Sequence, residues 1–516
     1  MKLSNLSKTS ILLFVCYGVD KCVAILRQLI IARQFGLSVE LDVFNIANNL
    51  PDMLFTLISG GALSMALIPV MADIIDRDGR KAGWKLFSSI ANLAFITAAA
   101  LSVIIAIFAE PIVVSEIGIA PGFTAEQQAL VVELMRLNLI ATLIFSLSGL
   151  VMGGLQANRH FLLPALAPIF YNLGQIFGAL IMAPTEPYRF GPITLPCMGL
   201  GIYGLVYGVI LGAVLHLLVQ VPALIRYEFR WYPIIRAKDD DVRRVLRVLG
   251  PRVISVFFVQ LIFIIRDNFA SRLAEGSVTA LSYGYMFQQL PETLIGTAIG
   301  TAILPSLSLY ISRKDYERYR SVIQSACRIA LALSFGSAAV MAVGLGPLIQ
   351  TLLGFDAGQT DLMMWTLRGF LVGLAGHCLL EIANRAYYAQ EEARVPLMGT
   401  ILNVLLYIGC GMLLYKRLDA PGISLTDSIA FTAQAVLMLI LLARTHSKVK
   451  TAPAPIHVWG TVLRSALGAL LAGGICFAVI RFLPAGALIA SIAGMILAMC
   501  VYIPCVIPEL KLLKSF

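Results

Sequence analysis

Long apolar runs separated by short polar connections extend along the whole chain. A helix that crosses a bilayer needs about 20 mostly apolar residues, and fourteen segments reach that length. They lie near residues 10–35, 43–74, 84–112, 127–156, 161–183, 198–225, 245–271, 278–310, 322–353, 361–388, 395–415, 425–443, 457–480 and 485–508. Four prolines (Pro51, Pro69, Pro291 and Pro305) predict kinks in the second and eighth segments. The pattern predicts an all-α polytopic membrane protein with 14 transmembrane helices.

Lysine and arginine gather in every second connection. Together with the N-terminus, these connections hold Lys2, Lys8, Arg77, Arg80, Lys81, Lys85, Arg159, the run from Arg226 to Arg247, Arg313, Lys314, Arg318, Arg320, Arg385, Arg394, Arg444, Lys448, Lys450, Lys511 and Lys514. The other connections hold Arg189, Arg272, Lys416, Arg417 and Arg481. Because cytoplasmic loops carry the excess of Lys and Arg, we expect both termini in the cytoplasm. One missed helix would invert the alternation downstream of it.

The second half of the chain repeats features of the first. Residues 134–136 match 366–368 at an offset of 232 residues, and Leu50-Pro51 matches Leu290-Pro291 at an offset of 240. Six helices followed by six more that enter from the same side form parallel repeats. The predicted parts are an N-lobe (1–225, helices 1–6), a cytoplasmic linker (226–244), a C-lobe (245–445, helices 7–12) and a C-terminal helix pair (446–516).

Composition agrees with lipid as the solvent, since 59% of the 516 residues are apolar and 13% are charged, against about 25% charged in soluble domains. The net charge of +10 lies in short clusters between apolar runs, which indicates membrane orientation and not nucleic-acid binding. Nine cysteines contain no C-x-x-C pair, and the five histidines are dispersed, so no metal, cofactor or disulfide framework is expected. The Gly-x-Gly-x-x-Gly pattern at 199–204 opens an apolar helix without a preceding strand, which favours close helix packing. No loop is long enough for a catalytic domain, and we expect no enzyme.

Charged residues inside the predicted spans are informative, because a charge at mid-membrane costs about 2.5–3.5 kcal/mol. They fall in the first, second, seventh and eighth helices, which the repeat makes equivalent pairs: Asp20, Lys21, Arg27, Asp42, Asp52, Arg266, Asp267 and Glu292. This distribution predicts a polar cavity shared by the two lobes. Fixed cations in such a cavity suit a dianionic pyrophosphate, whose oxygens the arginine fork binds well.

A simpler interpretation remains open for several of these charges. Asp20–Lys21 and Arg266–Asp267 could neutralise each other as sequence neighbours, while the side chains of Arg33, Asp42 and Arg272 reach an interface. Arg368 and Glu381 are weaker candidates, for which packing or interface roles fit equally well.

Two stretches of the chain resemble the MurJ (MviN) lipid II flippases. The first is Leu26-Arg27-Gln28 to Ala32-Arg33-Gln34-Phe35-Gly36, followed by Asp42-Val43-Phe44, Leu50-Pro51, Gly61-Ala62-Leu63 and Ile68-Pro69. The second is Ala270-Ser271, Gly276-Ser277-Val278, Leu290-Pro291, Gly300-Thr301 and Leu304-Pro305-Ser306-Leu307-Ser308. The resemblance extends over essentially the whole chain.

The resemblance implies the fold of the multidrug/oligosaccharidyl-lipid/polysaccharide exporter superfamily. It also implies a cationic cavity lined by helices one, two, seven and eight, and a groove for a polyprenyl tail at residues 457–508. The family's first-helix arginines fall on Lys21 and Arg27, and its following aspartate falls on Asp42. Three other charged positions of the family hold Phe55, Gly60 and Met286 here. Within this picture Lys21, Arg27 and Arg266 bind the anion, and Asp42, Asp52 and Asp267 orient them or gate.

The resemblance implies a flippase that carries a polyprenyl-pyrophosphate-linked peptidoglycan precursor (lipid II) from the cytoplasmic to the outer leaflet by alternating access. The alternatives are a flippase for another lipid-linked oligosaccharide, a MATE-like multidrug exporter, and a non-transporting scaffold for envelope assembly. The expected partners are an undecaprenyl-pyrophosphate-type substrate, membrane lipids and a coupling ion, with no nucleic acid. We expect a monomer in the bacterial inner (cytoplasmic) membrane.

Overall fold

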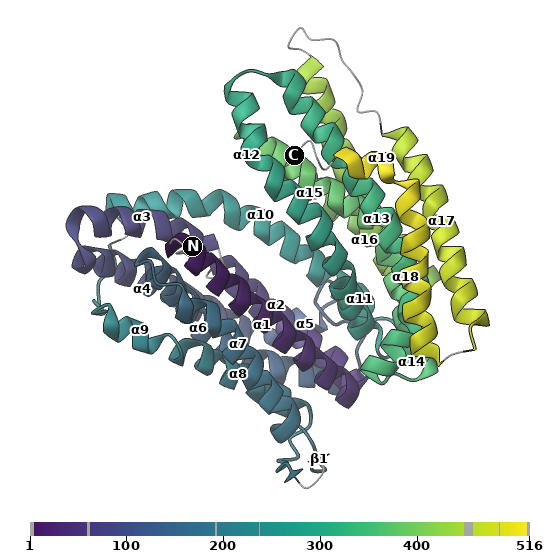
Figure 1. The fold of residues 1–516 in the computed structure, drawn as a ribbon. Coiled ribbons are helices and arrows are strands. Elements are labelled where there is room, and N and C mark those ends of the chain that lie inside the picture. The colour runs from purple at the N-terminus through teal and green to yellow at the C-terminus, as the bar shows by residue number, and fades with distance from the viewer. Residues whose placement is uncertain are drawn as a thin grey trace. The chain divides into compact units, whose positions relative to one another are not determined.

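The computed structural model describes residues 5–58, 62–190, 193–236, 238–447, 458–484 and 486–512. The chain forms two compact units, Met1–Arg272 (the first unit) and Leu273–Phe516 (the second unit) (Figure 1). The first unit consists of α1 (Asn5–Phe35), α2 (Val39–Ile58), α3 (Ala62–Asp78), α4 (Arg80–Ile107), α5 (Ala109–Val114), α6 (Ala125–Ala157), α7 (Leu162–Phe177), the π-helix η1 (Gly178–Met182), the antiparallel strands β1 (Arg189–Phe190) and β2 (Ile193–Thr194), α8 (Ile202–Leu218), α9 (Val221–Arg226) and α10 (Asp240–Ala270).

The described residues of the second unit form helices joined by short loops. It consists of α11 (Ser277–Glu292), the π-helix η2 (Thr293–Thr297), α12 (Ala298–Ser312), α13 (Tyr316–Leu353), α14 (Ala357–Val372), α15 (Leu374–Ala389), α16 (Arg394–Ser447), α17 (Trp459–Phe482), α18 (Ala487–Cys505) and α19 (Ile507–Leu510). The predicted all-α class is therefore confirmed.

Within the described residues, nine helices are long and apolar enough to cross a membrane, or ten if the bent pair α14–α15 is one span. Two of the predicted spans, 395–415 and 425–443, lie in the single helix α16, which is interrupted at Asp419 by a positive φ of 50°. Helices α1 and α10 carry internal charges such as Asp20, Arg27 and Arg266. The total of fourteen stays a prediction.

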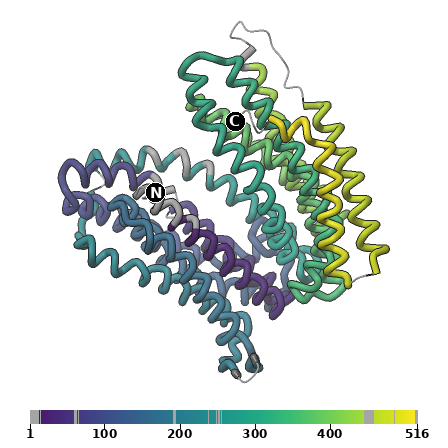
Figure 2. Tube along the Cα trace, in the orientation of Figure 1, coloured from purple at the N-terminus to yellow at the C-terminus, as the bar shows by residue number. Residues whose placement is uncertain are grey.

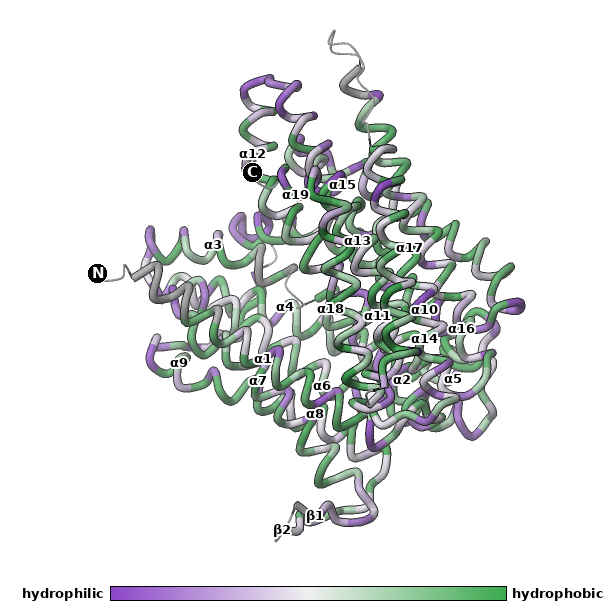
Figure 3. Tube along the Cα trace, turned by 45° about the vertical axis from the view of Figure 1, so that its right-hand side comes forward, coloured by the Kyte–Doolittle hydropathy of each residue, from purple (hydrophilic) through white to green (hydrophobic). Residues whose placement is uncertain are grey.

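Many large apolar side chains lie on the outside of the units, where water would be an unfavourable neighbour. On α17 the exposed apolar residues follow helical spacing, with Leu463, Leu467, Leu470, Leu471 and Phe477 each more than half exposed. Figure 3 shows apolar residues along most of the helical lengths. Lipid contact explains this distribution.

In the first unit, small residues let α7 and η1 approach α8 closely. A Cβ atom added at Gly178 would lie 2.6 Å from both the Gly204 carbonyl oxygen and the Gly208 Cα. Gly204 faces the Ala183 backbone in the same way, while Gly199 and Gly201 have positive φ angles of 69° and 55°. The Gly-x-Gly-x-x-Gly pattern therefore serves the backbone turn and close helix packing, as predicted.

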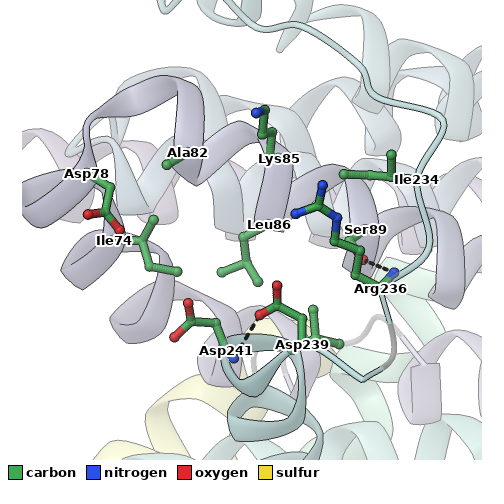
Figure 4. Close-up of a pocket in the computed structure, with 11 residues that line it drawn as sticks. Ile74, Asp78, Ala82, Lys85, Leu86, Ser89, Ile234, Arg236, Asp239 and Asp241 are labelled. Carbon is green, nitrogen blue, oxygen red and sulfur yellow. Dashed lines mark hydrogen bonds between the residues drawn. The ribbon is translucent and has the colours of Figure 1, made fainter.

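The segment between α9 and α10 lies against α4, whose side chains form hydrogen bonds with the backbone of the segment. The Trp84 indole donates to the Tyr227 carbonyl (2.9 Å), and the Asn92 amide donates to the Tyr232 carbonyl (2.8 Å). The Arg236 amide donates to Ser89 Oγ (2.9 Å), as Figure 4 shows. Helix α10 follows and packs on α2, α3 and α4. The compact units thus divide after α10, whereas the sequence repeat places this helix in the C-lobe; the lobe boundaries stay a prediction.

In the second unit, α17 and α18 pack together and both lie against α13 (yellow and teal in Figure 2). Helix α13 offers small or β-branched residues at every fourth position: Ala332, Gly336, Val340 and Gly344. The Tyr502 ring fills the space over Gly336, and its hydroxyl donates to the Ala332 carbonyl. Close packing of this kind holds helices together in lipid.

Glu509, beyond the end of α18, joins this helix pair to α13. Its carboxylate is fully buried and accepts hydrogen bonds from Arg464, from Thr461 (2.8 Å) and from Arg328 (3.3 Å). Burial raises the pKa of Glu509, but the hydrogen bonds from Arg464, Thr461 and Arg328 outweigh it and hold the pKa below its ordinary value.

This depressed pKa predicts a pH-dependent stability. A carboxyl whose pKa is lower in the folded state stabilises the fold above its unfolded pKa, and this contribution is lost as the pH falls through the folded pKa. We expect Glu509→Gln to cost about 1–3 kcal/mol at pH 7, seen as a lower melting temperature in detergent. The difference from the wild type should shrink as the pH falls below 4.5, the ordinary pKa of a glutamate, and through the lowered pKa of Glu509. The exposed Asp361→Asn is the control, and a pH-independent difference would contradict the prediction.

Candidate substrate-binding site

An asparagine of α7 connects two charges of α1 in the first unit. Asn172 is buried; its amide donates to Asp20 Oδ1 (2.9 Å), and its Oδ1 accepts from Arg27 Nη1 (2.9 Å). Asp20 and Arg27 are seven residues apart, about two helical turns, so both lie on the face of α1 that meets α7. Asn172 therefore holds the Arg27 guanidinium in place. It also keeps the Asp20 carboxylate near the guanidinium, although Asp20 and Arg27 are bridged by Asn172 and do not pair directly.

Arg27 keeps an unused donor. Its Nε is buried and has no hydrogen-bond partner among the described residues, although a buried donor without a partner costs about 1–3 kcal/mol. An anion that accepts a hydrogen bond from Arg27 Nε would satisfy this donor.

Lys21 is exposed and lies on a different face of α1. Asp20 and Lys21 form no ion pair in the described part of the chain, so the neutralising interpretation is wrong for this pair. Six residues separate Lys21 from Arg27, about 120° short of two full turns. The two cations therefore do not share the Asn172 contact.

Arg266 and Asp267 of α10 pair with each other, as the neutralising interpretation predicted. Arg266 Nε donates to Asp267 Oδ1 (3.0 Å), and Asn49 of α2 donates to the other carboxylate oxygen (2.5 Å). Both charged side chains are buried, and the guanidinium lies 5.1 Å from the Phe263 ring centre. The contact with α2 places this pair in the first unit; its role toward an anion stays a prediction.

The predicted aspartates of α2 differ in environment. Asp42, near the start of the helix, is 2% exposed, whereas Asp52 is exposed directly after Pro51. Their orienting or gating roles stay predictions.

Aromatic residues occupy the surroundings of Phe55, one of the positions where the resembling family has a charge. The Phe55 ring contacts Phe145 (5.4 Å between centres), which contacts Tyr171 (4.7 Å) and His216 (5.4 Å). Met286 on α11 is half-buried, and Gly60 lies outside the described residues. The surroundings of Phe55 in the first unit are therefore aromatic.

The remaining charged candidates have structural contacts. Arg368 donates to the Ala342 carbonyl (3.0 Å) and lies over the Trp365 ring (4.6 Å). Glu381 pairs with Arg385 (3.1 Å), and Arg272 pairs with Glu116 (2.8 Å).

Sequence reasoning missed Asn172 and a second polar cluster. Asn172 is one polar residue in an apolar helix, which the search for charges passed over. His377, which the sequence places among dispersed histidines, lies between the carboxylates of Glu292 and Asp427 in the second unit. The three come from separate helices, so no spacing rule could join them.

In the described residues no group of three His, Cys, Asp or Glu is arranged to hold a metal ion.

Known proteins show the same sequence pattern and fold. The family described as lipid II flippase MurJ matches residues 31–497. The lipid II flippase MurJ of Burkholderia cenocepacia is 28% identical over 427 residues, which cover 81% of this chain and 80% of the relative. A probable lipid II flippase MurJ of Buchnera aphidicola is 25% identical, covering 84% and 83%.

Two solved structures share the fold. A lipid II flippase MurJ in an inward closed conformation superimposes with a TM-score of 0.75 and 20% identity, covering 96% of this chain and 98% of that one. An inward-facing multidrug resistance MATE family transporter of the MOP superfamily gives 0.68 and 16%, covering 86% and 100%. The family match extends over most of the chain, and the chain therefore belongs to the lipid II flippase MurJ family.

Proposed function

We propose that this chain moves lipid II, a polyprenyl-pyrophosphate-linked peptidoglycan precursor, from the cytoplasmic to the outer leaflet. The family and the apolar helices make the chain an integral protein of the inner membrane and a transporter, not an enzyme. The observation that carries the proposal is the buried, unsatisfied Nε of Arg27 in a guanidinium held by Asn172. A pyrophosphate oxygen is an acceptor suited to that donor.

In the proposed mechanism the headgroup enters a cleft open to the cytoplasm, the two lobes rock, and the cleft reopens outward while the tail stays in lipid. Arg27 binds the pyrophosphate, and Asp20 and Asn172 hold the guanidinium in place. Lys21 and Arg266 add positive charge, and Asp42, Asp52 and Asp267 orient these cations or gate. Closing the site around the charge of Arg27 without an anion to accept from its buried Nε is unfavourable, which couples rocking to substrate. The exposed apolar face of α17 fits contact with the polyprenyl tail.

The aromatic surroundings of Phe55 favour a second candidate, a flippase for another polyprenyl-linked oligosaccharide. Sugars stack well on aromatic faces, and the charge of the family at this position is absent.

Depletion of the protein in its native host separates the two candidates. We expect the amount of the polyprenyl-linked peptidoglycan precursor in the cells to rise, because its translocation stops. Extraction and mass spectrometry of the polyprenyl-linked lipids measure this. Accumulation of a different lipid-linked glycan supports the second candidate, and accumulation of neither contradicts both.

A further inference from the structure

Three helices of the second unit bring ionisable side chains together in a buried place. His377 of α15 contacts Asp427 of α16 through Nε2 (2.8 Å) and Glu292 of α11 through Nδ1 (3.7 Å). The imidazole also stacks on Phe431, with 4.2 Å between the ring centres and 17° between the planes. The side chains of His377 and Asp427 are 3% and 6% exposed, and that of Glu292 is 17% exposed.

The geometry determines the charge of the imidazole. Both ring nitrogens face a carboxylate oxygen, and a neutral imidazole has only one N–H to donate. The imidazolium donates from Nε2 to Asp427 and holds its positive charge at ion-pair distance from Glu292 as well. The cluster of Glu292, His377 and Asp427 then carries two negative charges and one positive charge.

Among the described residues of the second unit, no neighbouring group supplies the missing positive charge. On α15, Glu381 and Arg385 form their own pair (3.1 Å), and the Cys378 thiol cannot carry a positive charge. Residues 293–312 of η2 and α12 and residues 329–353 of α13 contain no acidic or basic side chain. On α14, Asp361 is exposed, and Arg368 donates to Ala342 and stacks on Trp365. One negative charge therefore remains uncompensated inside an apolar helix bundle, which is costly.

Glu292 is the place where this charge is least well held. Its Oε2 is buried and has no hydrogen-bond partner among the described residues, and both amide atoms of Gln288, one turn earlier, also lack one. Glu292 is also the most exposed member of the cluster. We propose that Glu292, His377 and Asp427 form a proton-binding site, in which Glu292 takes up one proton from water and releases it again.

Proton uptake forms an O–H bond on the Glu292 carboxylate and brings the net charge of the cluster to zero; release breaks that bond and returns the proton to water. Glu292 follows Pro291, which has no amide hydrogen to donate, and precedes the π-helical turn η2. A change of charge at Glu292 therefore acts where the helix from Ser277 to Ser312 is least regular. This coupling role rests on the proposed transport function; the binding of the proton does not.

Infrared difference spectroscopy of the full chain in lipid nanodiscs tests the binding. As the pH is lowered from alkaline values to about 6, where exposed carboxyl groups with pKa values of about 4 stay ionised, we expect a carbonyl band of a protonated carboxyl group to appear, and to be lost in Glu292→Gln. The exposed Asp361→Asn keeps the band, and Glu292→Asp, which retains a carboxyl group, keeps it with a shifted midpoint. A band that persists in Glu292→Gln overturns the proposal. So does a band that responds to sodium at constant pH, because the site then binds a metal cation.

Lipid II translocation in proteoliposomes, with the pH set equal on both sides, tests the coupling. At pH values above the midpoint of the band, we expect the wild-type rate to fall about tenfold for each unit by which the pH rises, because it follows the protonated fraction of Glu292. The rate of Glu292→Gln should be independent of pH. If the band titrates and no pH supports translocation, the transport function fails and the proton site stands. If translocation occurs and Glu292 shows no band, the proton site fails alone.

Discussion

Replacing Arg27 by alanine is expected to reduce translocation of lipid II by at least about thirtyfold. The guanidinium is oriented by Asn172 and keeps a buried free donor, and truncating one partner of a buried charged hydrogen bond costs about 2–5 kcal/mol. Translocation in proteoliposomes and complementation of the depleted host both measure the loss. The translocation rate of Arg27→Lys should lie between those of the wild type and Arg27→Ala, because lysine keeps the positive charge but lacks the planar guanidinium.

Arg159→Ala is the matched control for this experiment. Arg159 is a largely exposed arginine paired at 3.6 Å with the exposed Asp76, so its loss should leave translocation near the wild-type rate. Equal amounts of protein in the membrane are checked for each variant. Normal translocation by Arg27→Ala at normal abundance would remove the basis of the proposed function.

Replacing Gly178 by alanine is expected to destabilise the first unit by about 1–3 kcal/mol, the usual cost of overpacking. The added methyl group meets the backbone of α8 at Gly204 and Gly208, at 2.6 Å from each. Backbone atoms cannot rotate away as a side chain can, so α7 and α8 must separate. The melting temperature of the purified protein in detergent measures the effect.

Gly409→Ala on α16 is the control for the packing experiment. A Cβ atom at Gly409 has nothing within 4 Å, and alanine favours helix over glycine by about 1 kcal/mol. We therefore expect an unchanged or slightly raised melting temperature. If Gly178→Ala is as stable as Gly409→Ala, then the close approach of α7 and α8 is not what holds them together.

The sequence predicts the class of this fold well, because a water-soluble protein could not keep so many apolar runs of membrane length in solution. It predicts helix boundaries less well. The charged residues of α1 and α10 make these helices weaker candidates for spans, and the break at Asp419 leaves two predicted spans in one helix. The breakpoint depends on a local backbone conformation, which a hydropathy pattern does not contain.

The polar site is less predictable, since it depends on which helix faces which. Charge spacing placed Asp20 and Arg27 on one helix but could not identify Asn172 as the residue between them. The adjacency of Arg266 and Asp267 suggested their ion pair, which forms. The same adjacency suggested a pair for Asp20 and Lys21, which form none in the part of the chain that the structure describes. His377 shows the opposite case, with both of its partners on other helices.

The four-residue spacing of Ala332, Gly336, Val340 and Gly344 on α13 bears on how the chain could be shortened. The Tyr502 ring lies over Gly336 and the Met495 side chain lies over Gly344. A descendant that lost residues 458–512 would expose the backbone of α13 at Gly336 and Gly344 to the acyl chains of the lipids. These chains are too mobile to fill the groove as the fixed Tyr502 ring does. Such a deletion could persist only if bulkier residues arose at positions 336 and 344, so large side chains there would mark a homologue that had dispensed with the last two helices.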